Sequence, residues 1–129
     1  MIVLDTHAWL WWTSDPDRLS DPARHALVAA DRIGVSTLSA WEVAMLASRG
    51  RIALDQAVAV WVRRAFAKPR VEALAPTVDV AVAAGLLDAQ RFPGDPVDRI
   101  IYATARDARA ALVTRDRAIR EFDARLTIW

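Results

Sequence analysis

The chain has 129 residues, with 17 basic and 16 acidic side chains, so its net charge is only +1. This length is typical of one domain, and we expect a single domain over residues 1–129. Hydrophobic residues make up 54% of the chain, which excludes a disordered protein. Cysteine is absent, which excludes disulfide frameworks, thiolate zinc sites and thiol nucleophiles. No apolar run approaches the roughly 20 residues that span a bilayer, and no signal peptide is recognisable, so we expect a cytoplasmic protein.

Short apolar runs alternate with helical segments along the chain, beginning with the continuous run Ile2–Leu4. The expected strands are 2–4, 33–36, 71–74, 111–114 and 126–128. The expected helices are 7–13, 21–31, 39–48, 56–67, 77–89, 97–109 and 116–122, with a turn at 93–96. Strands that alternate with crossover helices form a parallel sheet covered on both faces. The sequence therefore predicts a three-layer α/β/α fold with a central parallel sheet.

Capping residues predict where several helices begin. Ser20 stands before Asp21 and Pro22, a combination typical of a helix start. Ser39 and Glu42 have the spacing of a capping box, which would start the third helix at Ser39. Asp55 is expected to cap the fourth helix.

Four carboxylates follow the predicted strands or the turn at 93–96. Asp5 ends the first strand, and Asp116 lies just beyond the fourth. Glu42 is expected in the first turn of the helix after the second strand, and Asp98 in the first turn after 93–96. Because the carboxyl ends of parallel strands share one edge of the sheet, these acids should meet there. Clustered carboxylates repel one another unless they hold a cation, and oxygen ligands alone select Mg²⁺ or Mn²⁺.

Each acid also has a structural interpretation. Glu42 would complete the predicted capping box, and Asp116 would be the N-cap of the last helix. Asp98 would interact favourably with the dipole of the helix whose first turn it occupies. For Asp95 we favour the N-cap interpretation. Asp5 has no evident capping role, because Thr6 rather than a turn follows it.

The six tryptophans are expected to divide between the core and the surface. Trp9, Trp11 and Trp12 cannot all share the core-facing side of one short helix. We expect Trp9, Trp41 and Trp61 in the core, and Trp11 or Trp12 exposed as an anchor for a partner protein.

At four places the chain resembles the PIN domain. The segments are 1–7 (MIVLDTH), 35–42 (VSTLSAWE), 93–101 (PGDPVDRII) and 112–116 (LVTRD). They occur in the order and at the distances typical of that family, so the resemblance covers essentially the whole chain. More narrowly, the chain resembles the VapC-type toxins of bacterial toxin–antitoxin pairs.

The resemblance implies a metal-dependent ribonuclease whose catalytic acids and metal ligands are Asp5, Glu42, Asp98 and Asp116. Asp95 would then be an extra ligand through water, as an alternative to its capping role. Thr6 and Thr114 match positions near the metal that carry small hydroxyl residues in the family. The expected cofactor is Mg²⁺ or Mn²⁺, and the expected partners are an RNA substrate, a cognate antitoxin and a second copy of the chain.

With no thiol and no Ser–His or His–His pair, the predicted nucleophile is a metal-activated water. This route leaves a 5′-phosphate and a free 3′-hydroxyl. Three arginines flank the acids and are candidates to contact substrate phosphates, or else are solvated surface charges. They are Arg99, Arg115 and Arg117.

Two other function classes compete with the nuclease. A phosphoacceptor receiver domain also gathers acids and Mg²⁺, but it needs a lysine near the acceptor, and Lys68 lies before Pro69 at a helix end. The main alternative is a non-catalytic RNA- or ribosome-binding module on the same fold.

The near-neutral charge does not exclude RNA. Lys68 is the one lysine among the 17 basic residues, so arginine, which suits bidentate phosphate contacts, dominates the positive charge. If cations cancel four or five of the acids, the metal-bound protein is distinctly basic.

Overall fold

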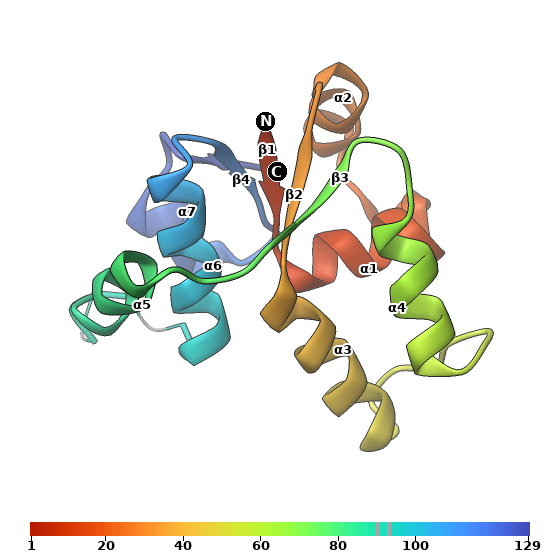
Figure 1. Ribbon diagram of the computed structural model, residues 1–129. Coiled ribbons are helices and arrows are strands. Elements are labelled where there is room, and N and C mark those ends of the chain that lie inside the picture. The colour runs from red at the N-terminus through yellow and green to blue at the C-terminus, as the bar shows by residue number, and fades with distance from the viewer. Residues whose placement is uncertain (90, 93) are drawn as a thin grey trace.

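A parallel sheet forms the centre of the computed structural model, which describes residues 1–89, 91–92 and 94–129 (Figure 1). Its strands are β1 (Ile2–Leu4), β2 (Ile33–Ser36), β3 (Val71–Leu74), β4 (Ala111–Val113) and β5 (Thr127–Ile128). Their order is β3-β2-β1-β4-β5, and every neighbouring pair is parallel. The predicted strands are confirmed to within one residue at each end.

Helices connect these strands in the alternation that the sequence predicts. They are α1 (Thr6–Ser14), α2 (Asp21–Ala29), α3 (Thr37–Ser48), α4 (Val58–Phe66), α5 (Val78–Gly85), α6 (Pro96–Asp107) and α7 (Arg117–Phe122), with a short 3₁₀ turn at Pro16–Arg18. In the described part of the chain, no helix is long and apolar enough to cross a membrane.

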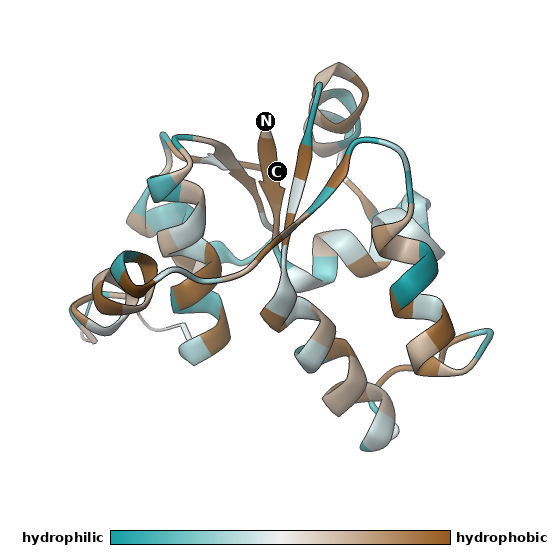
Figure 2. Ribbon diagram, in the orientation of Figure 1, coloured by the Kyte–Doolittle hydropathy of each residue, from teal (hydrophilic) through white to brown (hydrophobic). Residues whose placement is uncertain are grey.

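The alternation of side chains along β1 divides the core between the two faces of the sheet. Ile2 and Leu4 pack into one cluster with residues of α1, α2 and α4. Val3 packs into the other, with residues of α6 and α7. Both faces of this strand are thus apolar, as its colour in Figure 2 shows. Full burial of Val3 and Leu4 stabilises the fold by about 1.5–3 kcal/mol each. The three-layer α/β/α prediction is confirmed.

Several predicted helix boundaries are wrong. Helix α3 begins two residues earlier than expected, because Ser36 is its N-cap and accepts a hydrogen bond from Leu38 N at 3.2 Å. The Ser39–Glu42 capping box therefore does not form, and Glu42 lies in the second turn of α3. The residue before α4 is Ala57 and makes no side-chain cap, so Asp55 does not start that helix.

Other boundaries shift by smaller amounts. Helix α1 begins at Thr6 rather than at position 7, and α5 ends at Gly85 rather than near residue 89. The predicted turn at 93–96 includes Pro93, which lies outside the described residues.

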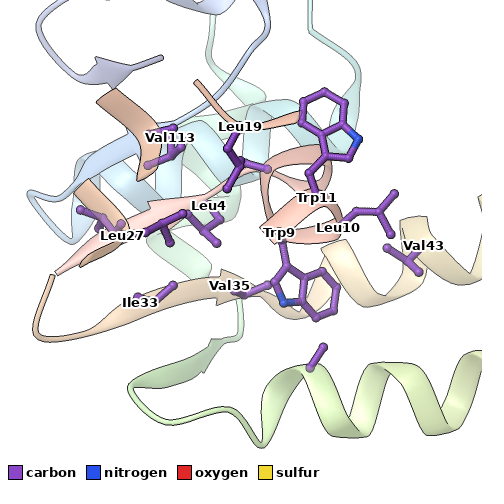
Figure 3. Packing of buried hydrophobic residues seen from close by; sticks show 14 of the residues in the cluster. Leu4, Trp9, Leu10, Trp11, Leu19, Leu27, Ile33, Val35, Val43 and Val113 are labelled. Atoms are coloured by element: carbon purple, nitrogen blue, oxygen red, sulfur yellow. The ribbon is translucent and has the colours of Figure 1, made fainter. Parts of the chain in front are cut away.

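The tryptophans divide differently from the prediction. Trp9 and Trp61 are buried as expected, with their rings 5.0 Å apart. Trp11 is also buried, beside the same core (Figure 3), and Trp12 is half-buried under the Lys68 ammonium group. Trp41 is 57% exposed, so its predicted core position is wrong. The earlier start of α3 sets which of its faces is buried, and Val43 and Leu46 lie on that face.

Candidate functional site

Asp5 lies directly after β1 and begins α1. Its Oδ1 accepts a hydrogen bond from Ala8 N at 2.7 Å, which makes Asp5 the N-cap of that helix. The expectation that Asp5 has no capping role is therefore wrong. The side chain is also almost fully buried. Burial raises the pKa of the Asp5 carboxyl, against hydrogen bonds from Thr114 and Ala8 that lower it.

Glu42 reaches the same region from α3. It is 9% exposed, and its buried Oε2 has no hydrogen-bond partner among the residues that the structure describes. Beside it, the Thr6 hydroxyl donates to Ser39 Oγ at 3.1 Å, which links the starts of α1 and α3. An unpartnered buried carboxylate oxygen is costly, so Glu42 is the residue of this group most in need of a ligand.

Asp95 and Asp98 stand on the first turn of α6. Asp95 is the N-cap of this helix, and its Oδ1 accepts from Asp98 N at 2.9 Å, as predicted. The carboxylate of Asp98 is left without a hydrogen bond from the described residues. Burial and the neighbouring charges of Asp95 and Glu42 raise the pKa of Asp98 to about 7, with smaller contributions from Asp5 and Asp116.

Asp116 comes after β4 and caps α7. Its Oδ1 accepts a hydrogen bond from Ile119 N at 2.9 Å, so the predicted N-cap role is confirmed. The fully buried Thr114 hydroxyl accepts from Asp116 N at 3.0 Å and fixes the turn between strand and helix. Thr6 thus links the helices that begin at Asp5 and carry Glu42, and Thr114 fixes the turn that precedes Asp116. Both threonines hold the elements that carry the acids.

These acids line one open pocket of about 520 Å³ at the carboxyl edge of the sheet. We call it the acidic pocket. Its lining residues are Asp5, Thr6, His7, Trp11, Arg18, Glu42, Asp95, Asp98, Arg115 and Asp116. Every acid predicted to belong to the site is present. His7, Trp11 and Arg18 are additions, and the sequence contains no pattern that would assign Arg18, since it ends the 3₁₀ turn after α1.

The chemistry of the acidic pocket fits a hard divalent cation. All five acids are oxygen donors, which suit Mg²⁺ or Mn²⁺. The mutual repulsion that raises the pKa of Asp98 and the unpartnered Oε2 of Glu42 are both relieved by a positive ion. As the side chains stand, no group of three His, Cys, Asp or Glu among the described residues is close enough to hold an ion.

Arg115 is the one arginine of the three predicted phosphate contacts that lines the acidic pocket. Arg117 is highly exposed and pairs with Glu121 at 2.7 Å. It lines a separate hollow next to the pocket.

Arg99 does not line the acidic pocket, and its predicted contact with a substrate phosphate stays a prediction. Its guanidinium donates to four backbone carbonyls, those of Ala84, Leu87, Phe92 and Gly94, at 2.8–3.3 Å. These contacts hold the segment between α5 and α6, a structural role that the sequence alone did not indicate.

Lys68 lies over the Trp12 ring at 4.5 Å and does not line the acidic pocket. A phosphoacceptor receiver site, which needs an ammonium group beside the acids, is therefore not formed by the described residues.

A family model for the PIN domain matches residues 2–125. The chain belongs to the PIN domain family. Among curated relatives, Ribonuclease VapC22 of Mycobacterium tuberculosis is 38% identical over 99% of this chain and 98% of its own. The predicted membership of the family is thus confirmed. The acids of the pocket lie within the four sequence segments on which that prediction was based.

Solved structures with the same fold are more distant in sequence. A toxin–antitoxin complex from Klebsiella pneumoniae has a TM-score of 0.71 at 21% identity, and covers 100% of this chain and 97% of its own. Mycobacterium tuberculosis VapC20, described as a sarcin-ricin loop cleaving toxin, has a TM-score of 0.69 at 19% identity, covering 96% and 94%. At these identities the likeness establishes the fold alone.

Proposed function

We propose that this PIN domain protein is a metal-dependent endoribonuclease and the toxin of a toxin–antitoxin pair. One observation supports this most: Asp5, Glu42, Asp98 and Asp116, which lie far apart in the sequence, line one acidic pocket. The 38% identity to a VapC ribonuclease over nearly the whole chain supports the same activity. No observation favours the alternative of a non-catalytic RNA- or ribosome-binding module.

The proposed cofactor is Mg²⁺ or Mn²⁺, held by Asp5, Glu42, Asp98 and Asp116. When bound, such an ion lowers the pKa of a water molecule and neutralises charge on the reacting phosphate. Asp5 and Asp116 suit the role of fixed ligands, because one oxygen of each is held by a helix N–H. The Asp5 carboxylate also accepts a hydrogen bond from Thr114. The carboxylate lone pairs that these bonds leave free can bind an ion.

Glu42 and Asp98 are held less firmly and suit a different role. Neither carboxylate is a helix cap, and the pKa of Asp98 is already close to neutral. Either side chain can complete the ligand set or accept the proton that the attacking water loses. Asp95 is fixed as a cap, and we assign it at most an outer contact through water.

The proposed partners are an RNA substrate, a cognate antitoxin and a second copy of the chain. We propose that residues 1–129 act as one nuclease domain in the cytoplasm, where RNA is available. Arg115 lines the acidic pocket, which supports the proposal that it contacts a substrate phosphate.

The direct test is cleavage of a panel of structured RNAs by the purified protein, with Mn²⁺ or with EDTA. Cleavage in Mn²⁺ alone, leaving 5′-phosphate and 3′-hydroxyl ends, is expected. Asp5→Asn is the control, since asparagine also caps a helix and removes only the charge. Binding without cleavage over the whole panel would show a non-catalytic module instead.

The toxin role needs a cellular readout. Induced wild-type protein should arrest growth, and Asp5→Asn should not. Equal inhibition by both proteins, at equal expression, would show that growth arrest does not depend on the acidic pocket.

A further inference from the structure

A second hollow lies beside the acidic pocket, at the end of β5 and along α7. Its volume is about 370 Å³, and we call it the C-terminal hollow. Its lining residues are Arg117, Arg120, Glu121, Ala124, Thr127 and Trp129. The pairing of β4 with β5 brings the two hollows together, because Thr114 N donates to Ile128 O at 3.2 Å. Trp129 therefore follows β5 next to the point where Arg115 and Asp116 follow β4.

An aromatic contact connects the two hollows. The rings of Trp11, which lines the acidic pocket, and Trp129, which lines the C-terminal hollow, lie 5.7 Å apart. The guanidinium carbons of Arg18 and Arg115 lie 4.7 and 5.6 Å from the centre of the Trp11 ring. A continuous rim of two tryptophans and two arginines thus leads from one hollow to the other.

The arginines along this route carry positive charge that the protein does not neutralise. In the described part of the chain, Arg18, Arg115 and Arg120 form no ion pair, although Arg18 and Arg115 line the same pocket as five acids. Only Arg117 is paired, with Glu121 at 2.7 Å. Unpaired guanidinium groups beside aromatic rings are the features that bind single-stranded nucleic acid, through phosphate contacts and stacking.

We propose that the C-terminal hollow is a second RNA subsite, which binds the strand flanking the cleaved bond. The strand leaves the acidic pocket past Arg18 and Arg115, crosses Trp129 and places a phosphate against Arg120. This subsite rests on the proposed ribonuclease function and adds Arg120 and Trp129 as positioning residues. Neither touches the reacting phosphate, so both affect binding of the flanking strand rather than the chemical step.

Arg120→Gln tests the proposal, with Arg51→Gln as a matched control. Arg51 is exposed and lines neither hollow. Both changes are made in the full chain carrying Asp5→Asn, and binding of labelled oligouridylates is measured in Mn²⁺ at several salt concentrations. One probe has about 12 nucleotides and the other about 4, which spans the range of single-strand site sizes.

For the long probe, Arg120→Gln should weaken binding roughly fivefold and lower the slope of log K against log[salt] by about 0.7, the value for one single-strand phosphate contact. The short probe should bind unchanged. Glu121→Gln, which frees Arg117 and removes a negative charge, should tighten binding of the long probe. Arg51→Gln should change neither. Because Arg51→Gln changes the net charge by the same amount as Arg120→Gln, the difference between these two variants distinguishes a local subsite from a change in net charge.

If the wild-type protein cleaves RNA, equal effects of Arg120→Gln and Arg51→Gln on binding would overturn the second subsite. The proposed nuclease activity would then still stand. An equal loss for both probe lengths would also overturn it, since Arg120 would then act within the acidic pocket. Failure of the wild type to cleave any RNA would instead remove the proposed function on which the subsite depends.

Discussion

The acids of the pocket fall into two groups, which differ in whether the carboxylate caps a helix. Asp5, Asp95 and Asp116 each cap a helix, and each has one oxygen held by a backbone N–H at 2.7–2.9 Å. Glu42 and Asp98 cap nothing. Glu42 has a buried oxygen that finds no hydrogen-bond partner in the described part of the chain, and the pKa of Asp98 is raised to about 7.

These two groups show how a fold can hold clustered negative charge. A capping carboxylate is stabilised by a helix N-terminus whether or not a cation is present. A carboxylate without a cap depends on the proton or on the ion that occupies the pocket. The capping group should therefore resist loss of metal, and the group without caps should respond to it.

The largest expected effect is the loss of RNA cleavage when Asp5, a helix N-cap and proposed metal ligand, is replaced. Asp5→Ala should lower RNA cleavage at least about 10³-fold, as loss of a central catalytic electrostatic group does. It should also cost about 1 kcal/mol of stability through the lost cap. Asp5→Asn should lose the same activity at little cost in stability. Single-turnover cleavage and thermal melting measure the two effects separately, and retained activity in either variant would exclude Asp5 as a ligand.

The next effect is a pH dependence of stability without metal. The folded pKa of Asp98, about 7, lies above the ordinary value of 3.8. Between these values the folded state keeps a proton that the unfolded chain has lost. The free energy of unfolding in EDTA should therefore fall as pH rises from about 4 to about 7, by up to about 4 kcal/mol, and then level off. Denaturant melts across this range measure it.

Asp98→Asn is the control for the pH dependence, because it removes the titrating group. The part of the fall that Asp98 contributes should disappear in this variant, while Asp5, whose pKa is also raised by burial, keeps its own contribution. Mn²⁺ should reduce the fall in the wild type. A wild-type stability that rises with pH over the same range would contradict the assignment to Asp98.

Two smaller effects are expected when Glu42 is changed: cleavage should fall, while stability without metal should not. Glu42→Gln should lower cleavage about 10²-fold, as loss of one positioned proton acceptor does. Without metal the same change should leave the melting temperature unchanged or raise it, because it relieves repulsion in the pocket. Calorimetry in EDTA and in Mn²⁺ tests this. A clear loss of stability in EDTA would show that Glu42 has a structural role like that of the caps.

The smallest expected effect is a difference in stability between two substitutions of Asp116, which separates the negative charge of the side chain from its capping role. Asp116→Asn keeps an N-cap and should preserve stability without metal, whereas Asp116→Ala should lower it by about 1 kcal/mol. Both should abolish cleavage. The difference between the two melting curves isolates the contribution of the cap to Asp116, and its absence would show that Ile119 N is satisfied without it.

The sequence predicted the sheet and the grouping of the acids well, because both follow from strand order. Residues that come after parallel strands meet at one edge whatever the details of the helices. Helix starts were harder, since Ser36 and Ser39 are both good caps and tertiary packing selects between them. The exposure of Trp41 was missed for the same reason.

The roles of the arginines could not be predicted from motifs. Arg99 and Arg115 each adjoin a pocket acid in sequence, yet one holds backbone carbonyls and the other lies at the pocket wall. The path of the chain decides between these roles. Arg18 depends even more on tertiary structure, since it reaches the Trp11 ring only through the 3₁₀ turn that follows α1.

The backbone contacts of Arg99 have a mechanical consequence for its neighbour. Asp98 faces the acidic pocket, while the next side chain ties the first turn of α6 to carbonyls at Ala84, Leu87 and Phe92. The position of a pocket carboxylate is thus coupled to backbone contacts of Arg99 that lie outside the acidic pocket. Loss of these contacts would change the geometry of the Asp98 carboxylate, although none of the three carbonyl residues lines the pocket.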